Sequence, residues 1–115
     1  MQADIRLYLQ ITQKIEAAIL SGRIQPGQRL PAIRELASYA QVNPNTVQKA
    51  VSELKRMGLV EASRSGQTAR VTPDTLLIQR RRQEKALEQV RRLKIQLLTL
   101  GYQETEITDL VSDYI

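Results

Sequence analysis

The chain has 115 residues, 42% of them hydrophobic and 3% aromatic, which suits one compact domain with an appendage and an aliphatic core. It lacks cysteine and histidine, which excludes the usual zinc ligands, cysteine nucleophiles and a histidine proton shuttle. Residues 1–72 hold 10 Lys and Arg against 5 Asp and Glu, the whole net charge of +5, whereas residues 73–115 balance at 7 against 7. The front part is therefore expected to attract a polyanion, with an ordinary solvated basic surface as the alternative.

Helical spacing over residues 4–21 predicts the first helix, because apolar side chains recur there every three or four positions. Gly22 is expected to end this helix, and a loop containing a Pro-Gly pair follows. Pro31 is expected in the first turn of a second helix that continues to Ala40, because a proline there loses no backbone hydrogen bond.

Residues 41–43 predict a tight turn, in which Asn43 is the N-cap of a third helix and Pro44 its first residue. This third helix is expected to run to about Met57, and Gly58 to end it. Two helices joined in this way indicate a helix-turn-helix, whose second helix enters the major groove of DNA.

Two short alternating segments, residues 59–62 and 68–71, flank a turn with Arg64 and Gly66 and predict a β-hairpin. Three helices and a hairpin are the plan of a winged helix-turn-helix. We therefore predict a mainly α fold with a small β-hairpin. Its winged helix-turn-helix domain is expected over residues 1–72, and a two-helix dimerisation tail over residues 73–115.

The tail is expected to hold a long helix from residue 74 or 75 to residue 100, closed by Gly101, and a short final helix. Its apolar stripe is too wide to stay exposed and needs either the chain's own domain or a second subunit; we favour a two-fold homodimer. The predicted dimerisation residues are Leu87, Val90, Leu93, Leu97, Leu100, Ile107, Leu110, Val111 and Tyr114.

The start of the third helix is expected to present polar side chains to base edges and phosphates, since Asn and Gln pair with adenine and Lys and Thr contact phosphates. Arg34, in the first turn of the second helix, is expected to reach the same DNA; a surface contact with Glu35 or Glu61 is the alternative. The predicted DNA-contact residues, with a wing in the minor groove, are Arg34, Asn45, Thr46, Gln48, Lys49, Arg64 and Gly66. The alternative is that Asn43 and Asn45 only cap a core helix and keep its start solvated.

The densest charge cluster is the run of residues 80–82, all arginine. It can add phosphate contacts, or it can be a solvated helix face that pairs with Glu84, four residues after Arg80, and with Glu88. We favour the solvated face. The acidic residues are scattered and no Gly-rich phosphate loop is present, so we expect no enzyme, no cofactor and no metal site, although carboxylates can hold a hard cation.

Residues 1–72 resemble the N-terminal winged-helix domain of the GntR family of transcription regulators. The matching segments are Leu7-Tyr8-Leu9-Gln10-Ile11, Ile19-Leu20-Ser21-Gly22-Arg23-Ile24-Gln25-Pro26-Gly27, Leu30-Pro31, Arg34-Glu35-Leu36-Ala37, Val42-Asn43-Pro44-Asn45-Thr46-Val47 and Leu59-Val60-Glu61. The Asn-Pro-Asn-Thr-Val turn and the short tail resemble the YtrA-like subfamily. The resemblance implies a dimeric repressor, often of transporter operons that include its own gene, and points to Arg34, Asn45, Thr46 and Gly66 as DNA contacts.

The sequence departs from the family pattern at four places. Ala32 stands where Ser or Thr is usual, so a hydroxyl cap is lost, and Pro44 stands where many members have Arg. The wing lacks the second glycine and the Phe, which leaves Arg70 for a different contact. Gln103 stands where a shorter polar cap is usual, so we expect the last helix to fray.

We therefore expect a sequence-specific regulator, most simply a repressor, that binds an inverted repeat in double-stranded DNA as a homodimer. No apolar signal core or transmembrane run is present, so we expect a soluble cytoplasmic protein without a membrane partner. A small-molecule effector in the dimer groove stays open. The alternatives are a protein-interaction module whose tail binds a transporter or enzyme, and architectural DNA binding without sequence preference.

Overall fold

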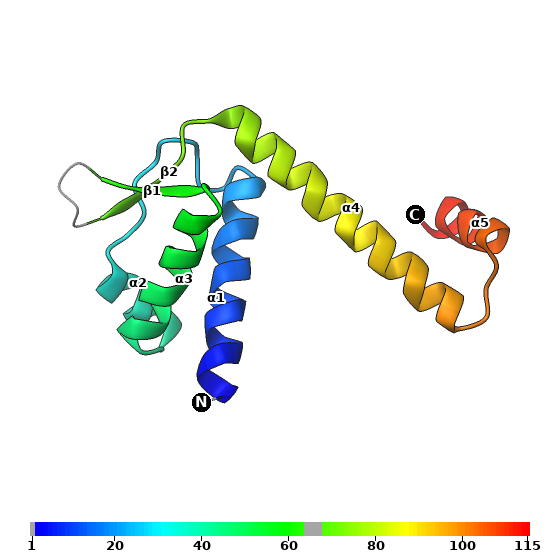
Figure 1. The fold of residues 1–115 in the computed structure, drawn as a ribbon, viewed down its shortest axis with the longest axis horizontal. Coiled ribbons are helices and arrows are strands. Elements are labelled where there is room, and N and C mark those ends of the chain that lie inside the picture. Colours follow the sequence, from blue (N-terminus) through cyan, green and yellow to red (C-terminus); the bar gives the residue numbers. More distant parts are fainter. Residues whose placement is uncertain (1, 64–67) are drawn as a thin grey trace. The chain divides into compact units, whose positions relative to one another are not determined.

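The computed structural model describes residues 2–63 and 68–115. Its elements in chain order are α1 Gln2–Leu20, α2 Ile33–Ala40, α3 Pro44–Arg56, β1 Val60–Ala62, β2 Ala69–Val71, α4 Thr75–Thr99 and α5 Glu104–Tyr114 (Figure 1). The predicted fold class, three helices and a hairpin followed by two tail helices, is confirmed.

The chain divides into two compact units, Met1–Gln79 and Arg80–Ile115. The first unit thus extends beyond the boundary after residue 72 that the sequence suggests. The reason lies in the first turn of α4, where Ile78 is buried in the core of this unit and Leu77 packs against it. α4 therefore belongs to both units.

The first unit is built around α3, which packs against both α1 and α2 (Figure 1). Its core is aliphatic, as the composition requires, and the largest fully buried side chains are Ile19, Val47, Leu54, Leu59 and Val71. The hydrophobic effect supplies about 25 cal/mol for each Å² of apolar surface that such side chains remove from water. A core of this kind needs neither disulfides nor a metal.

The hairpin is antiparallel and pairs Val60 with Val71, Glu61 with Arg70 and Ala62 with Ala69. Val60 and Val71 are buried whereas Arg70 is exposed, as alternation along a strand requires. Residues 27–30 pair with the other edge of β2, where the Leu30 N–H donates to the Ala69 carbonyl at 2.8 Å. This pairing fixes the loop between α1 and α2 to the sheet.

The start of α2 differs from the prediction that placed Pro31 in its first turn. The helix begins at Ile33, and Ala32 is its N-cap, with an extended backbone and no side-chain cap hydrogen bond. Because Leu30 is still bonded to β2, the chain stays extended through Pro31 and turns into the helix only afterwards. The absence of a hydroxyl cap at Ala32 agrees with the sequence.

The turn between α2 and α3 is formed by two helix caps. Gln41 closes α2 in the left-handed region, at φ 56° and ψ 47°, and the Val42 N–H donates to the Ala37 carbonyl at 3.0 Å. Asn43 then caps α3, since its side chain accepts a hydrogen bond of 2.8 Å from the Asn45 N–H. The predicted turn and N-cap are confirmed.

In the second unit, α4 ends at a glycine-based cap. Gly101 has φ 97° and donates to the Leu98 carbonyl at 2.9 Å, and the Tyr102 N–H donates to the Leu97 carbonyl at 3.2 Å. Gln103, expected to cap α5 poorly, donates its N–H to the Glu106 carboxylate at 3.0 Å. This bond holds the first turn of α5, contrary to the expected fraying.

Candidate nucleic-acid interface

α3 has two faces of opposite character. Thr46, Val47, Ala50, Val51 and Leu54 are buried, and together they form the side that packs against the core. The opposite side is exposed and polar, and its residues are Asn45, Gln48, Lys49, Ser52, Lys55 and Arg56. Positions 45, 49, 52 and 56 follow one another at intervals of three or four, so they form one row along the helix. This exposed face has the donors and positive charge that contact with DNA requires.

Three of the predicted contact residues on α3 are exposed as expected. Asn45 and Lys49 lie in the row, and Gln48 lies beside it. Asn45 is in the first turn of α3, where its own N–H donates to the Asn43 side chain at 2.8 Å, so it is the Asn45 side chain that is offered to a ligand. The three side chains can therefore approach one ligand together.

Thr46 was predicted to lie on the exposed start of α3, and the structure corrects this prediction. Only 7% of this residue is exposed, because it lies one helical turn before Ala50 on the face that packs against the core. A threonine at that edge contributes to packing. Contact between Thr46 and DNA stays a prediction.

Arg34 is exposed in the first turn of α2, next to α3 in the first unit. Glu61, one of its two suggested alternative partners, pairs instead with Arg70 across the hairpin, where Nη2 and Nε of the arginine each lie 2.8 Å from a carboxylate oxygen. This cross-strand pair is also the different contact expected of Arg70. The exposed position of Arg34 agrees with its predicted role.

The predicted wing residues Arg64 and Gly66 lie outside the described residues. The arms of the hairpin are described as far as Ser63 and Thr68, whose backbones pair at 2.8 Å and whose hydroxyl groups lie 3.2 Å apart. DNA contact by the wing therefore stays a prediction.

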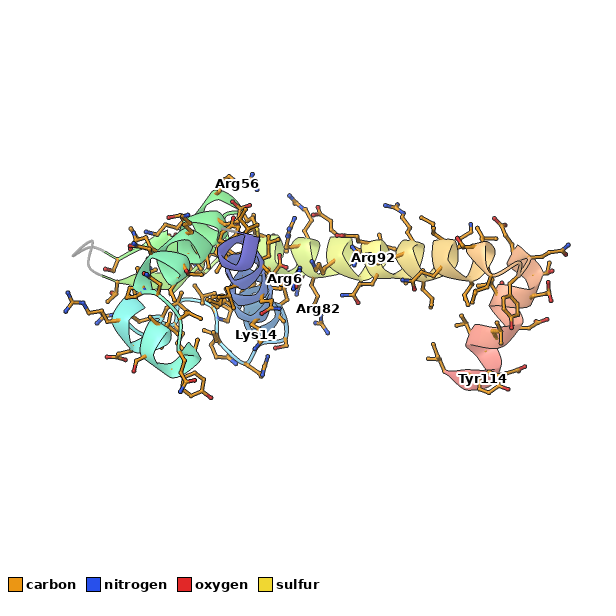
Figure 2. All side chains as sticks on the ribbon, turned by 90° about the horizontal axis from the view of Figure 1, so that it is seen from below. Arg6, Lys14, Arg56, Arg82, Arg92 and Tyr114 are labelled. Atoms are coloured by element: carbon orange, nitrogen blue, oxygen red, sulfur yellow. The ribbon has the colours of Figure 1, made fainter. Side chains whose placement is uncertain are left out.

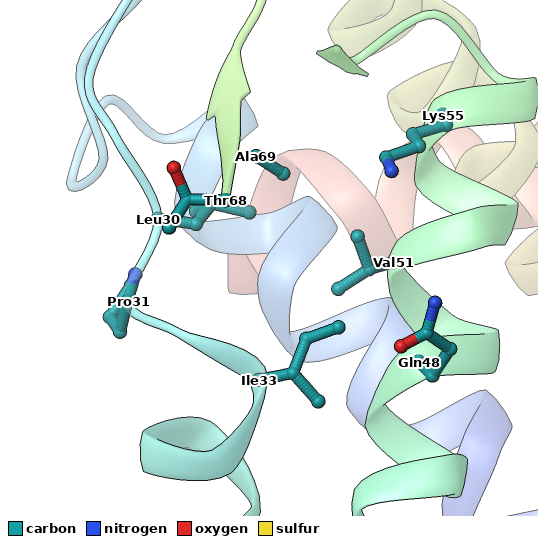
Figure 3. Close-up of a pocket in the computed structure, with 8 residues that line it drawn as sticks. All are labelled: Leu30, Pro31, Ile33, Gln48, Val51, Lys55, Thr68 and Ala69. Atoms are coloured by element: carbon teal, nitrogen blue, oxygen red, sulfur yellow. The ribbon is translucent and has the colours of Figure 1, made fainter. Parts of the chain in front are cut away.

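A hollow of about 140 Å³ lies beside α3 (Figure 3). In the figure, Gln48, Val51 and Lys55 extend from α3 toward the start of β2 and the segment that precedes α2. The remaining lining residues are Leu30, Pro31, Ile33, Thr68 and Ala69. The amide of Gln48 and the ammonium of Lys55 thus border an open surface between the helix and the hairpin.

A second, more open hollow, of about 360 Å³, lies between α1 and α3 and is lined by Tyr8, Gln48, Lys49, Ser52, Glu53 and Arg56. Ser52, Glu53 and Arg56 are not among the contact residues predicted from the sequence. The intervals of three and four residues that start at Asn45 place Ser52 and Arg56 on the same face, and this signal would have found them. The exposed face of α3 therefore extends over the whole helix.

In the tail, the arginine run pairs differently from the expectation of partners four residues apart. Arg81 lies 3.7 Å from Glu84, three residues further on, while Glu88 pairs with Arg92 at 3.2 Å. A solvated helix face with such pairs agrees with the favoured interpretation of this run.

Among the described residues, no helix combines the length and the apolar character needed to cross a membrane. Two helices, α1 and α2, that pack against α3, followed by a two-stranded hairpin, define this molecule as a winged helix-turn-helix protein of the DNA-binding class.

The particular family follows from sequence comparison. Residues 7–71 match the family model described as bacterial regulatory proteins, gntR family, and the chain belongs to this family. The resemblance inferred from the sequence is thereby confirmed. Membership in a family of regulatory proteins also agrees with the expectation that the chain is not an enzyme.

The curated relatives match about half of the chain. The HTH-type transcriptional repressor YtrA of Bacillus subtilis (strain 168) is 47% identical over 58 residues, which cover 50% of this chain and 45% of that protein. The chain spans about half the length of the curated relatives it matches.

Two solved structures extend the comparison. A GntR family transcriptional regulator from Listeria monocytogenes is 28% identical, with a TM-score of 0.85 over 94% of each chain. The DNA-binding domain of AraR, solved in complex with operator ORR3, is 30% identical, with a TM-score of 0.54 over 57% of this chain and 78% of that one.

Proposed function

We propose that this protein is a sequence-specific transcriptional repressor that binds an inverted-repeat operator as a homodimer. The observation that supports this most directly is the exposed polar face of α3 within a gntR-family winged helix. The similar repressor YtrA and the operator complex of the AraR domain support the same function. A two-fold dimer presents two such helices, so its operator would contain two inverted half-sites.

The residues proposed to contact DNA fall into groups with different roles. Asn45 and Gln48 read base edges in the major groove, because an amide can both donate to and accept from adenine. Arg34 contributes base discrimination from the adjoining helix, and Lys49 contributes affinity through phosphates. Arg64 and Gly66 of the wing are proposed to contact the flanking minor groove.

The tail is proposed to form the dimer. No residue of the second unit is buried within the chain, although its helices carry many large apolar side chains. Among the proposed dimer residues, Val90 is 63% exposed and Leu100 is 73% exposed. The whole predicted set is Leu87, Val90, Leu93, Leu97, Leu100, Ile107, Leu110, Val111 and Tyr114. Burial of these stripes against a second copy would remove a surface that monomers rarely expose.

The small-molecule effector is a further proposal. Within the tail, a hollow of about 210 Å³ is lined by Val90, Leu93 and Lys94 of α4 and by Glu104, Ile107, Thr108 and Val111 of α5. The Lys94 ammonium lies 2.9 Å from the Glu104 carboxylate. An apolar ligand with one polar group would suit this lining. We also propose that the protein is cytoplasmic and controls a transporter operon that includes its own gene.

The proposed function is tested by fluorescence anisotropy on the DNA upstream of this protein's own gene and on a scrambled duplex, at near-physiological salt. A preference of about a thousandfold or more is expected for an operator-binding protein. Equal, weak and salt-sensitive binding to both duplexes would indicate architectural binding or another operator. Absence of binding to either would favour the interaction module.

The dimer is tested by analytical ultracentrifugation of the wild type and of Leu93→Asp. The wild type is expected to sediment as a dimer and the variant as a monomer, because a buried carboxylate without a partner opposes association. Circular dichroism of both proteins controls for folding. A monomeric wild type at every concentration would contradict the proposed dimer.

A further inference from the structure

Glu53 is the one acidic residue in the sequence of α3, which otherwise holds three basic residues. It follows Ser52 on the side of the exposed row that lies nearest α1, and it lines the hollow between these two helices together with Tyr8. Its side chain is 27% exposed, whereas that of Arg56, one turn later, is 72% exposed. A carboxylate thus lies at the edge of the face proposed to meet DNA.

The Glu53 carboxylate accepts three hydrogen bonds from Arg56. The Arg56 Nε donates to both carboxylate oxygens, at 3.1 and 3.0 Å, and Nη2 donates to Oε1 as well. The hydrogen bond from Arg56 is the main reason that the pKa of Glu53 lies below its ordinary value, and Tyr8 lowers it further. Glu53 is therefore ionised at neutral pH.

This pair changes what Arg56 offers to a polyanion. Arg56 extends from α3 into solvent (Figure 2), in the same row as Asn45 and Lys49. One edge of its guanidinium is occupied by Glu53, and the two charges cancel at close range. A phosphate oxygen that approached Arg56 would meet an ion pair with no net charge. It would also have to displace the Glu53 carboxylate, which binds the paired N–H groups of a guanidinium as a phosphate does.

We propose that Glu53 is an internal counterion of Arg56 that keeps this arginine from binding the phosphates of DNA. Glu53 thereby limits affinity for DNA of any sequence and leaves discrimination to the side chains at the start of α3. This inference rests on the proposed function, because it assumes that α3 faces DNA. It makes Glu53 a residue that determines specificity without touching a base.

The test measures binding to a labelled random-sequence duplex by anisotropy over a range of KCl concentrations around 0.1 M, roughly where the Debye length is about 10 Å. Glu53→Gln keeps the size of the side chain and removes its charge. One further phosphate contact steepens the slope of log K against log salt by about 0.9, which amounts to close to tenfold tighter binding at about 0.1 M salt. In Glu53→Gln with Arg56→Gln this gain is expected to vanish, because Arg56 mediates it.

The matched control is Glu88→Gln in the tail, where Glu88 Oε1 lies 3.2 Å from Arg92 Nη2 on α4. This substitution makes the same change in net charge and releases an arginine whose side chain is 67% exposed, against 72% for Arg56. A small change is expected. If Glu53→Gln and Glu88→Gln raise the affinity for the duplex equally, the effect comes from net charge alone and the proposal is overturned.

Other outcomes separate this proposal from the proposed function. If the wild type binds DNA while Glu53→Gln binds equally or more weakly, Glu53 is no counterion and only this proposal fails. If neither the wild type nor any variant binds a duplex even at low salt, this proposal and the proposed function both fail. Arg56→Gln alone provides a check that does not depend on the folding of Glu53→Gln: its salt slope is expected to match the wild type, and a slope shallower by about 0.9 would overturn the proposal.

Discussion

Replacement of Gln41 by glycine is expected to stabilise the winged-helix unit. Gln41 is the one residue other than glycine with a positive φ among the described residues, and it closes α2 at φ 56° and ψ 47°. This conformation costs an L-residue about 1–2 kcal/mol, because Cβ approaches the following carbonyl. Glycine avoids that cost but loses about 0.5–1 kcal/mol more backbone entropy on folding. The difference leaves a net gain of about 0.5–1 kcal/mol.

Thermal unfolding followed by circular dichroism, at one fixed protein concentration, measures this gain. A domain of about 60–100 residues gains about 4–8 °C in Tm per kcal/mol, so Gln41→Gly is expected to raise Tm by about 2–8 °C. Gln41→Asn is expected to fall between glycine and the wild type, because asparagine tolerates the left-handed region. Ser38→Gly, an exposed position inside α2, is the control and is expected to lower Tm. An unchanged or lower Tm for Gln41→Gly would refute the argument from strain.

Three further substitutions test the interface and the core. Arg34→Ala is expected to cost about 1–3 kcal/mol on the operator in anisotropy titrations, and an equal loss on scrambled DNA would make Arg34 a phosphate contact. Lys49→Ala is expected to weaken binding to both duplexes alike and to make the salt slope shallower by about 0.9; a loss confined to the operator would contradict its assignment to phosphates. Leu54→Ala empties a position that is 0% exposed and is expected to cost about 2–5 kcal/mol in urea unfolding, so a loss well below that would mean that the core collapses around the cavity.

Local signals predicted much of this fold from the sequence. Gly22, Gly58 and Gly101 end helices with positive φ, and Asn43 and Pro44 start α3, as expected. These features depend on the conformational range of single residues and on hydrogen bonds within one turn. Helical periodicity likewise separated the buried face of α3 from the side that holds Asn45, Gln48 and Lys49.

Two expectations and one alternative failed where the decisive contact comes from a distant segment. Pro31 was expected inside α2, but pairing of Leu30 with Ala69 of β2 keeps the chain extended there. Thr46 was expected to be exposed, but the packing of α3 against its neighbours buries it. In the alternative to DNA contact, Glu61 was a suggested partner of Arg34, but strand register places Glu61 opposite Arg70.

The sequence by itself determined where α3 begins, where α1, α3 and α4 end, the aliphatic nature of the core, the family, and the polar character of the exposed side of α3. These properties follow from composition, periodicity and cap residues, which act over a few neighbouring positions. Only the tertiary structure decided which polar residues of α3 are free to meet a ligand and which are buried. It also showed the hollow in which Glu53 lies beside Tyr8 and binds Arg56, because that site joins α1 and α3, which are far apart in the chain.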